Sequence, residues 1–358
     1  MNKKISSIES LRDRIDSVDR ELVSLLNERG KISQEIGHYK KSINRAVYAP
    51  DREAMVYKGA VGKNKGPLKN DSIKAIYREI MSACLSVEKD LIIAFLGPEL
   101  TFTHQAAVKK FGQSVKYLPC ENISDVYTEV EKGNADYGVV PIENSTEGAV
   151  THTMDMFVDS DLKICAEIFM RISHSILSSA KSLREIKKVY SHPSVFGQCR
   201  GWIEKNIPYA RLEDVSSTVK AAQKAGKDHG AACIGSEWAA SRYGLNILSR
   251  MIEDSSRNFT RFLVIGKEMG QPSGKDKTSL MFSVKDKPGV LHDMLGAFKK
   301  RGINLSRIES RPSKVKAWKY YFYLDLEGHS AEPKVQKALE DLNLNCIFVK
   351  VLGSYPKG

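Results

Sequence analysis

The chain has 358 residues, of which 42% are hydrophobic and 27% charged, and its formal net charge is +12. A single hydrophobic core rarely organises more than about 250 to 300 residues, so we expect two or three domains. No apolar run approaches the ~20 residues that cross a bilayer, which argues against a membrane protein. Lysine and arginine are interspersed with acidic residues and do not form the basic block that is typical of nucleic-acid binding.

The N-terminal stretch MNKKISSIESLRDRID carries early acidic residues and has no apolar signal core, which predicts a cytoplasmic protein. The six cysteines are scattered without a CxxC or Cys/His spacing. This distribution predicts neither a disulfide framework nor a metal site.

Apolar or large residues recur at alternating spacings of three and four between residues 5 and 49, a stretch without proline. The pattern predicts one helix with a heptad seam. Such a helix would be about 55 to 60 Å long, too long for the rest of a small domain to wrap, so a partner chain is expected to cover it. Two further helices are predicted at residues 51–61 and 68–89. The seam consists of Ile8, Leu11, Ile15, Val18, Leu22, Leu25, Ile32, Ile36, Tyr39 and Ile43.

Arg29 interrupts this seam at a position that the spacing reserves for an apolar side chain. A buried guanidinium is costly unless an anion meets it. One interpretation is that Arg29 pairs with a glutamate and fixes helix register. The other is that it binds a small polyanion together with Arg12, Lys40 and Arg52.

The run LRDRIDSVDRELVSLLNERGKISQEIGHYK, followed by VYAPDRE and IMSACLSVE, resembles the all-helical chorismate mutase family. The resemblance implies an intramolecular rearrangement of chorismate to prephenate, in which arginines hold two carboxylates and other donors stabilise the ether oxygen. It assigns the carboxylates to Arg12, Arg29 and Arg52, the ether oxygen to Lys40 and a substrate hydroxyl to Glu53. Arg12 would come from the partner chain.

Three positions depart from the family's commonest pattern, which has aspartate at Ala49, serine at the substrate-binding position Cys84, and glutamine in some members at Glu88. Because of the departures at Ala49 and Cys84, a chain with reduced mutase activity stays open as an alternative. An ionised Glu88 would repel the ether oxygen, so this carboxyl has to carry a proton in order to donate a hydrogen bond. We therefore expect catalytic Glu88 to give a mutase activity that rises towards acid pH.

From Leu91 the hydrophobic period changes to short buried runs separated by helical stretches, which predicts alternating α/β architecture. Ligands of such folds bind in loops at the carboxyl ends of strands or between two lobes. The predicted strands cover residues 91–96, 115–118, 137–142, 162–169, 187–192 and 230–235.

Polar residues follow strand ends in FLGPELTFTHQAA, VVPIENSTEGAV, YSHPSVFGQC and SRNFTRFLVIG, each of which alone describes an ordinary α/β loop. Together and in this order they resemble prephenate dehydratase, from about Leu91 to Lys267. The resemblance implies a two-lobed, periplasmic-binding-protein-like fold in which the Thr260 hydroxyl assists departure of the substrate hydroxyl. Its further implied pocket residues are Thr103, Asn144, Ser145, Thr146, Arg261 and Phe262. His192 is an alternative acid, although it also suits a helix cap.

After the polar linker EMGQPSGKDK the pattern predicts a ferredoxin-like βαββαβ order. The runs DKPGVLHDML and RIESRPSK resemble the ACT regulatory domain over about residues 278–356. Backbone amides at the turn containing Gly289 suit an amino-acid carboxylate, although Pro288 and Gly289 could simply start a helix. The resemblance implies an effector site, usually formed between subunits, for which we expect Gly289, Val290, Leu291, Glu309, Ser310, Arg311 and Pro312.

These segments predict a multidomain chain with an all-α domain at 1–90, a two-lobed α/β domain at 91–267 and an α+β ferredoxin-like domain at 278–358. The implied function is a bifunctional enzyme of phenylalanine biosynthesis, inhibited by phenylalanine and working as a homodimer or tetramer. No cofactor, metal, nucleic acid or membrane partner is expected. Two rival hypotheses are an amino-acid-sensing DNA regulator and a non-catalytic two-lobed binding protein.

Overall fold

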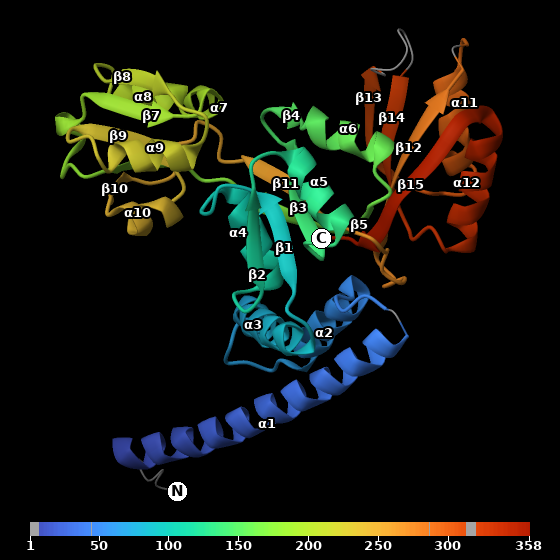
Figure 1. Cartoon of the computed structure of the whole chain (residues 1–358), viewed down its shortest axis with the longest axis horizontal. Coiled ribbons are helices and arrows are strands. Elements are labelled where there is room, and N and C mark those ends of the chain that lie inside the picture. The colour runs from blue at the N-terminus through green and yellow to red at the C-terminus, as the bar shows by residue number, and fades with distance from the viewer. Residues whose placement is uncertain (1–6, 44, 286, 313–319) are drawn as a thin grey trace, which may run out of the picture. The chain divides into compact units, whose positions relative to one another are not determined.

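A computed structural model describes residues 7–43, 45–285, 287–312 and 320–358 (Figure 1). The chain separates into two compact units. The smaller unit comprises Met1–Ala49, Val56–Leu91 and Phe111–Lys116, and the larger comprises Pro50–Met55, Ile92–Lys110 and Tyr117–Gly358. Five residues of the predicted elements lie outside the described ones: Ile5, Ser6, Asn44, Trp318 and Lys319.

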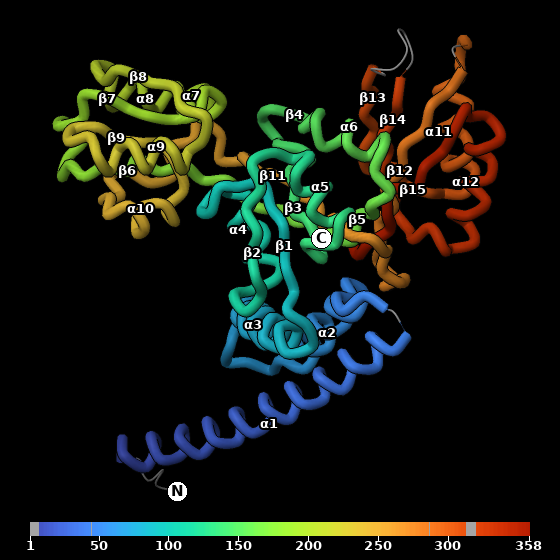
Figure 2. The backbone as a smooth tube through the Cα atoms, in the orientation of Figure 1, coloured from blue at the N-terminus to red at the C-terminus, as the bar shows by residue number. Residues whose placement is uncertain are grey.

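Three successive helices form the N-terminal segment, as predicted: α1 (Ile8–Ser42), α2 (Pro50–Lys63) and α3 (Asn70–Glu88). Helix α1 begins after Ser7, whose hydroxyl accepts a hydrogen bond from Ser10 N. It then runs unbroken for 35 residues, as the tube in Figure 2 shows. At 1.5 Å per residue it is about 52 Å long. No helix in the described ranges combines the length and apolarity that crossing a membrane requires.

The apolar seam of α1 is open to solvent. Ile15 is 60% exposed, Leu22 50% and Tyr39 67%, and the other seam residues are exposed in the same way. The buried residues of this helix are Ser33 and Gly37. The expectation that the seam needs cover from another molecule is therefore consistent with the fold of the single chain.

The first α/β lobe is built on a mixed sheet with the strand order β2-β1-β3-β11-β5, in which β4 pairs with β3. Strand β11 lies between β3 and β5, antiparallel to both, and seven of its eight residues are buried. The elements of this lobe are β1 (Ile92–Leu96), α4 (Phe102–Phe111), β2 (Lys116–Cys120), α5 (Ile123–Lys132), β3 (Tyr137–Asn144), β4 (Gly148–Ala149), α6 (Thr151–Asp159), β5 (Lys163–Arg171) and β11 (Phe259–Gly266).

The second lobe has its own sheet, in the order β10-β6-β9-β7-β8. The chain leaves the first lobe after β5 and returns to it in β11, so two segments join the lobes. The sequence did not predict the four-residue strands β6, β8 and β10. The elements are β6 (Ser175–Ser178), the 3-10 helix η1 (Leu183–Glu185), β7 (Lys188–Ser191), α7 (Pro193–Gln198), α8 (Arg200–Asn206), β8 (Arg211–Asp214), α9 (Thr218–Ala225), β9 (Ala231–Gly235), α10 (Trp238–Tyr243) and β10 (Asn246–Ser249).

The C-terminal module has the predicted βαββαβ order, and its antiparallel sheet runs β13-β14-β12-β15. Helices α11 and α12 cover one face (Figure 1). On the other face Met281, Tyr323, Leu352 and Tyr355 belong to the same hydrophobic core as the first lobe. The module is thus packed on the first lobe. Its elements are β12 (Asp276–Val284), α11 (Val290–Lys299), β13 (Leu305–Pro312), β14 (Tyr320–Glu327), α12 (Pro333–Asn345) and β15 (Cys346–Pro356).

Candidate active sites

Two of the predicted mutase residues meet between α1 and α3. Lys40 Nζ lies 3.0 Å from Glu88 Oε2 and also donates to Val47 O at 2.5 Å. Gly37, one turn earlier on α1, allows the approach, because a Cβ there would be 3.1 Å from Glu88 Cα. Sequence analysis did not single out Gly37, although a glycine inside a long helix signals close packing. The result is a half-buried ammonium beside a buried carboxyl.

Arg29 is half-buried at its seam position and donates to Cys84 Sγ. This contact joins the predicted carboxylate-binding arginine to the cysteine that stands where serine is frequent. Arg29 thus contacts a thiol in the described chain, rather than the glutamate of the helix-register interpretation. Arg12 is exposed on the same helix.

The two predicted residues of α2 are placed differently. Arg52 is exposed, whereas Glu53 lies 2.9 Å from Lys110 Nζ at the end of α4, with only 11% of the glutamate side chain exposed. The carboxylate expected to bind a substrate hydroxyl is therefore held in an ion pair.

Thr260 and Asn144 are direct partners on the neighbouring strands β11 and β3. Asn144 Nδ2 donates to Thr260 Oγ1 at 2.8 Å and to Asn258 Oδ1 at 2.9 Å. Asn144 Oδ1 accepts from the backbone N–H of Thr146 and Glu147, which shapes the loop that follows β3. Because Thr260 Oγ1 accepts this hydrogen bond from the Asn144 amide, the proton of the Thr260 hydroxyl can be donated to a ligand.

A cavity of about 430 Å³ lies beside this pair, a volume typical of small-molecule sites. Asn258 belongs to its wall and connects it to Asn144, while Thr260, 8% exposed, is not among the lining residues. Of the predicted substrate residues, Thr146 lines this cavity. The lining comprises Thr146, Glu147, Ser194, Gly197, Gln198, Glu253, Asp254, Ser255 and Asn258.

Two other predicted substrate residues have different environments. Ser145 Oγ donates to Arg257 O and accepts from Phe259 N, so it ties the loop to the start of β11. Thr103 is buried in α4, with 6% of its surface exposed. The structure thus gives Ser145 a backbone-bonding role and does not bring Thr103 to the cavity wall.

Sequence analysis missed a polar group on the segments that join the lobes. His174 is 1% exposed, its Nε2 lies 2.9 Å from Gln198 Oε1, and its Nδ1 has no hydrogen-bond partner among the described residues. Burial lowers the pKa of His174, against the opposing effects of Gln198, Glu253 and Glu147. Its sequence signal was weak, since it consists of one histidine between the apolar runs of β5 and β6.

His192, the alternative acid, is the N-cap of α7, where its Nδ1 accepts a hydrogen bond from Ser194 N. The helix-cap interpretation is therefore the one observed.

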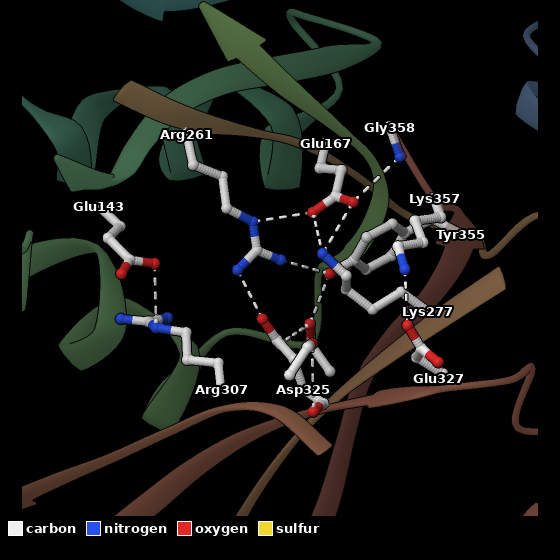
Figure 3. Close-up of polar contacts among 12 residues, drawn as sticks. Glu143, Glu167, Arg261, Lys277, Arg307, Asp325, Glu327, Tyr355, Lys357 and Gly358 are labelled. Carbon is white, nitrogen blue, oxygen red and sulfur yellow. Dashed lines mark hydrogen bonds and ion pairs between the residues drawn. The ribbon is translucent and has the colours of Figure 1, made fainter. Parts of the chain in front are cut away.

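The structure corrects the expected roles of Arg261 and Phe262. Successive side chains of a strand point to opposite faces, so Arg261 points away from the face of Thr260. Its guanidinium donates to Glu167 Oε2 at 2.8 Å, Asp325 Oδ2 at 2.5 Å and Tyr355 Oη at 2.8 Å (Figure 3). Phe262 is 2% exposed and lines no part of the 430 Å³ cavity.

The predicted effector residues lie at two places of the C-terminal module. Gly289 caps α11 with φ 77°, a left-handed conformation that favours glycine, and Val290 and Leu291 begin that helix half-buried. On β13, Ser310 and Pro312 are exposed and Glu309 is half-buried. Arg311 instead pairs with Asp155 of α6, so its side chain contacts the first lobe rather than a site for an effector.

The fold and these sites define a class of multidomain chain: a helical domain with a lysine–glutamate pair, a two-lobed α/β domain with a polar cavity, and a ferredoxin-like module. Three family models match in that order: chorismate mutase type II at residues 11–89, prephenate dehydratase at 93–270 and the ACT domain at 278–343. A relative from Aquifex aeolicus (strain VF5), described as bifunctional chorismate mutase/prephenate dehydratase, is 50% identical over 99% of both chains. This chain belongs to the family of bifunctional chorismate mutase/prephenate dehydratases.

Solved structures resemble about three quarters of the chain. A prephenate dehydratase from Arthrobacter aurescens, in complex with L-Phe, is 34% identical with a TM-score of 0.69, over 75% of this chain and 90% of its own. The protein GqqA, described as a novel type of quorum quenching acylase, is 28% identical with a TM-score of 0.67, over 75% of this chain and 98% of its own. Similarity over these parts alone therefore does not decide the chemistry.

Proposed function

We propose that the helical domain of this chain rearranges chorismate to prephenate, and that the α/β lobes convert prephenate to phenylpyruvate under inhibition by phenylalanine. The observation that carries the second reaction is the Asn144–Thr260 hydrogen bond beside a cavity of about 430 Å³. The similarity of the whole chain to a bifunctional relative supports both reactions.

For the mutase, the chemistry requires only that chorismate be held compact and that charge on its ether oxygen be stabilised. Lys40 can donate to that oxygen, and Glu88, whose Oε2 lies 3.0 Å from Lys40 Nζ, can donate to it when it carries a proton. Arg29 binds a carboxylate bidentately, and Arg12 of a second chain binds the other. The exposed seam of α1 supports this second chain, because a heptad surface of this length buries its apolar residues against another helix.

For the dehydratase, the electrons of the bond to the ring carboxylate move into the ring as carbon dioxide leaves, and the ring hydroxyl departs. That hydroxyl needs a proton to leave as water. Thr260 supplies a hydrogen bond and relays the proton, while Asn144 holds Thr260 Oγ1 in place. The aromatic ring that forms provides the driving force, so a weak acid suffices.

Phenylalanine as the effector is supported by the structural relative that was solved with L-Phe. Gly289, with its left-handed backbone, and the exposed Ser310 are the residues we expect to contact it. Two or four copies of the chain would bring two modules together. A cytoplasmic location is supported by the cysteines, all six of which are free, as in a reducing compartment.

One coupled assay tests these activities. Purified full-length chain is given chorismate, and prephenate and phenylpyruvate are followed over time, with and without phenylalanine. We expect both products in sequence and less phenylpyruvate with the effector. Chorismate consumption without phenylpyruvate would contradict the dehydratase assignment, and salt-sensitive binding to duplex DNA with no turnover would favour the regulator hypothesis.

A further inference from the structure

Four charged side chains lie directly behind the Asn144–Thr260 pair. The neighbouring residues on the same two strands, Glu143 and Arg261, are also partners in register. Because side chains alternate along a strand, these two lie on the face opposite to Asn144 and Thr260. That face is covered by the sheet of the C-terminal module (Figure 3).

The module presents a matching pair of charges. Arg307 and Asp325 are partners in register on β13 and β14. Arg261 Nη1 lies 2.5 Å from Asp325 Oδ2, and Arg307 Nε lies 3.1 Å from Glu143 Oε2. Two cross-strand pairs, one in each sheet, are thus joined by two ion pairs into a ring of four residues, which we call the charge square: Glu143, Arg261, Arg307 and Asp325.

The alternation of charge makes the square specific for one position of the two sheets. Neighbouring strands are about 4.8 Å apart, so a slide of one sheet by one strand would set Asp325 against Glu143 or Arg307 against Arg261. Like charges would then face each other where Arg261 and Asp325 are each only 6% exposed. A slide of the two sheets by one strand is therefore opposed by charge.

Further contacts from the same strands hold helix α6, which follows the loop between Asn144 and Val150. Arg311 Nη2 lies 2.5 Å from Asp155 Oδ2, and Tyr323 Oη donates to Met154 O at 2.8 Å. Both acceptors are on α6, which starts just after the loop between Asn144 and Val150. The module thus contacts that loop at its beginning, through Glu143, and beyond its end.

We propose that the charge square consists of positioning residues, which set β3 and β11 so that Asn144 and Thr260 meet, and which transmit occupancy of the effector site to this pair. A ligand that displaces β13 moves Arg307, which pulls on Glu143, the residue preceding Asn144. This inference rests on the proposed dehydratase function and its regulation.

The test compares Arg307→Gln with Arg301→Gln. Arg301 pairs with Asp341 at 2.7 Å inside the module and has similar exposure, so it is a matched ion pair that does not reach the first lobe. For each full-length variant, kcat and KM for prephenate, the phenylalanine concentration giving half-inhibition, and the mutase rate are measured. A second comparison sets Asp325→Asn against Glu327→Gln on the same strand, whose partner is the exposed Lys357.

Arg307→Gln and Asp325→Asn should lower kcat with little change in KM and raise the half-inhibiting concentration about fivefold or more. Their matched controls should not, and Arg307→Lys, which keeps the charge, should recover part of the loss. Because Glu143 and Arg307 act as one pair, the double variant Glu143→Gln/Arg307→Gln should be no worse than the more impaired single variant.

Values of kcat and half-inhibition within about twofold of the controls would overturn the proposal. An additive loss in the double variant would overturn the pairing of Glu143 with Arg307. If the wild-type chain turns over prephenate and phenylalanine does not inhibit it, the effector assignment is wrong, and so is the proposed transmission from the effector site. The comparison of kcat values still decides whether the charge square positions Asn144 and Thr260. If Asp325→Asn does not fold, the more exposed Arg307→Gln decides alone.

Discussion

Replacing Thr260 by valine removes one hydroxyl while keeping the size and branching of the side chain. Thr260 Oγ1 accepts from Asn144 Nδ2, but the same nitrogen also donates to Asn258 Oδ1 at 2.9 Å. The amide therefore keeps a partner in the variant. We expect the free energy of unfolding to change by about 1 kcal/mol or less.

The effect on dehydratase turnover should be much larger. Loss of a positioned proton donor typically lowers rates by about 10²- to 10⁴-fold. At ~1.36 kcal/mol per factor of ten, this corresponds to about 2.7 to 5.4 kcal/mol in the activation barrier. Thr260→Ser, which keeps the hydroxyl, should lose far less.

Both activities can be measured on the same preparation, so the mutase serves as an internal control. Chorismate disappearance depends on Lys40 and Glu88 and should be unchanged in Thr260→Val, whereas phenylpyruvate formation from prephenate should be almost lost. A variant that retains a tenth or more of the wild-type kcat would refute the role of this hydroxyl. Equal loss of both activities would indicate a disturbed fold.

Three further predictions concern other parts of the chain. If Glu88 can donate a hydrogen bond to the ether oxygen only when it carries a proton, Glu88→Gln, whose amide donates at any pH, should raise mutase kcat at pH 7; an unchanged or lower kcat would contradict this. Leu22→Glu, on the exposed seam of α1, should dissociate the oligomer in sedimentation and reduce mutase activity, whereas Ser24→Glu, off the seam, should not. Because burial lowers the pKa of His174 from 6.5, the folded state binds its proton less readily than the unfolded state; the urea midpoint should fall as the pH drops below 6.5, and less so in His174→Gln. Equal pH dependence in both chains would show that His174 is not responsible.

The sequence was sufficient for the first helix and the C-terminal module because their periods are distinct, whereas the two lobes were expected only from the resemblance to prephenate dehydratase. The heptads of α1 and the βαββαβ order of the C-terminal module each extend over many residues, so one ambiguous position changes little. Four residues do not establish a period, and of the four-residue strands only β7 was predicted, whereas β6, β8 and β10 were missed. His174 was missed for the same reason, since its position depends on where β5 ends and β6 begins.

The site was harder to predict, for two different reasons. Thr260 and Arg261 were both expected in one pocket, although the alternation of a strand already places neighbours on opposite faces. That error could have been avoided from the sequence. The pairing of Arg307 with Glu143 could not have been found, because nothing local marks one arginine among many charged residues as the partner of a distant glutamate.

The same alternation explains how one strand can serve two surfaces. Strand β11 lies between β3 and β5, and seven of its eight residues are buried. Both of its faces are therefore covered by protein, and consecutive residues contact different neighbours. Thr260 bonds to Asn144, whose amide also bonds to Asn258 in the cavity wall, and Arg261 bonds to Asp325 of the module. The path from regulatory module to candidate catalytic hydroxyl is then one peptide unit, about 3.3 Å along the strand. A helix at this place would put neighbouring residues only about 100° apart, and a single element could not face both sites so directly.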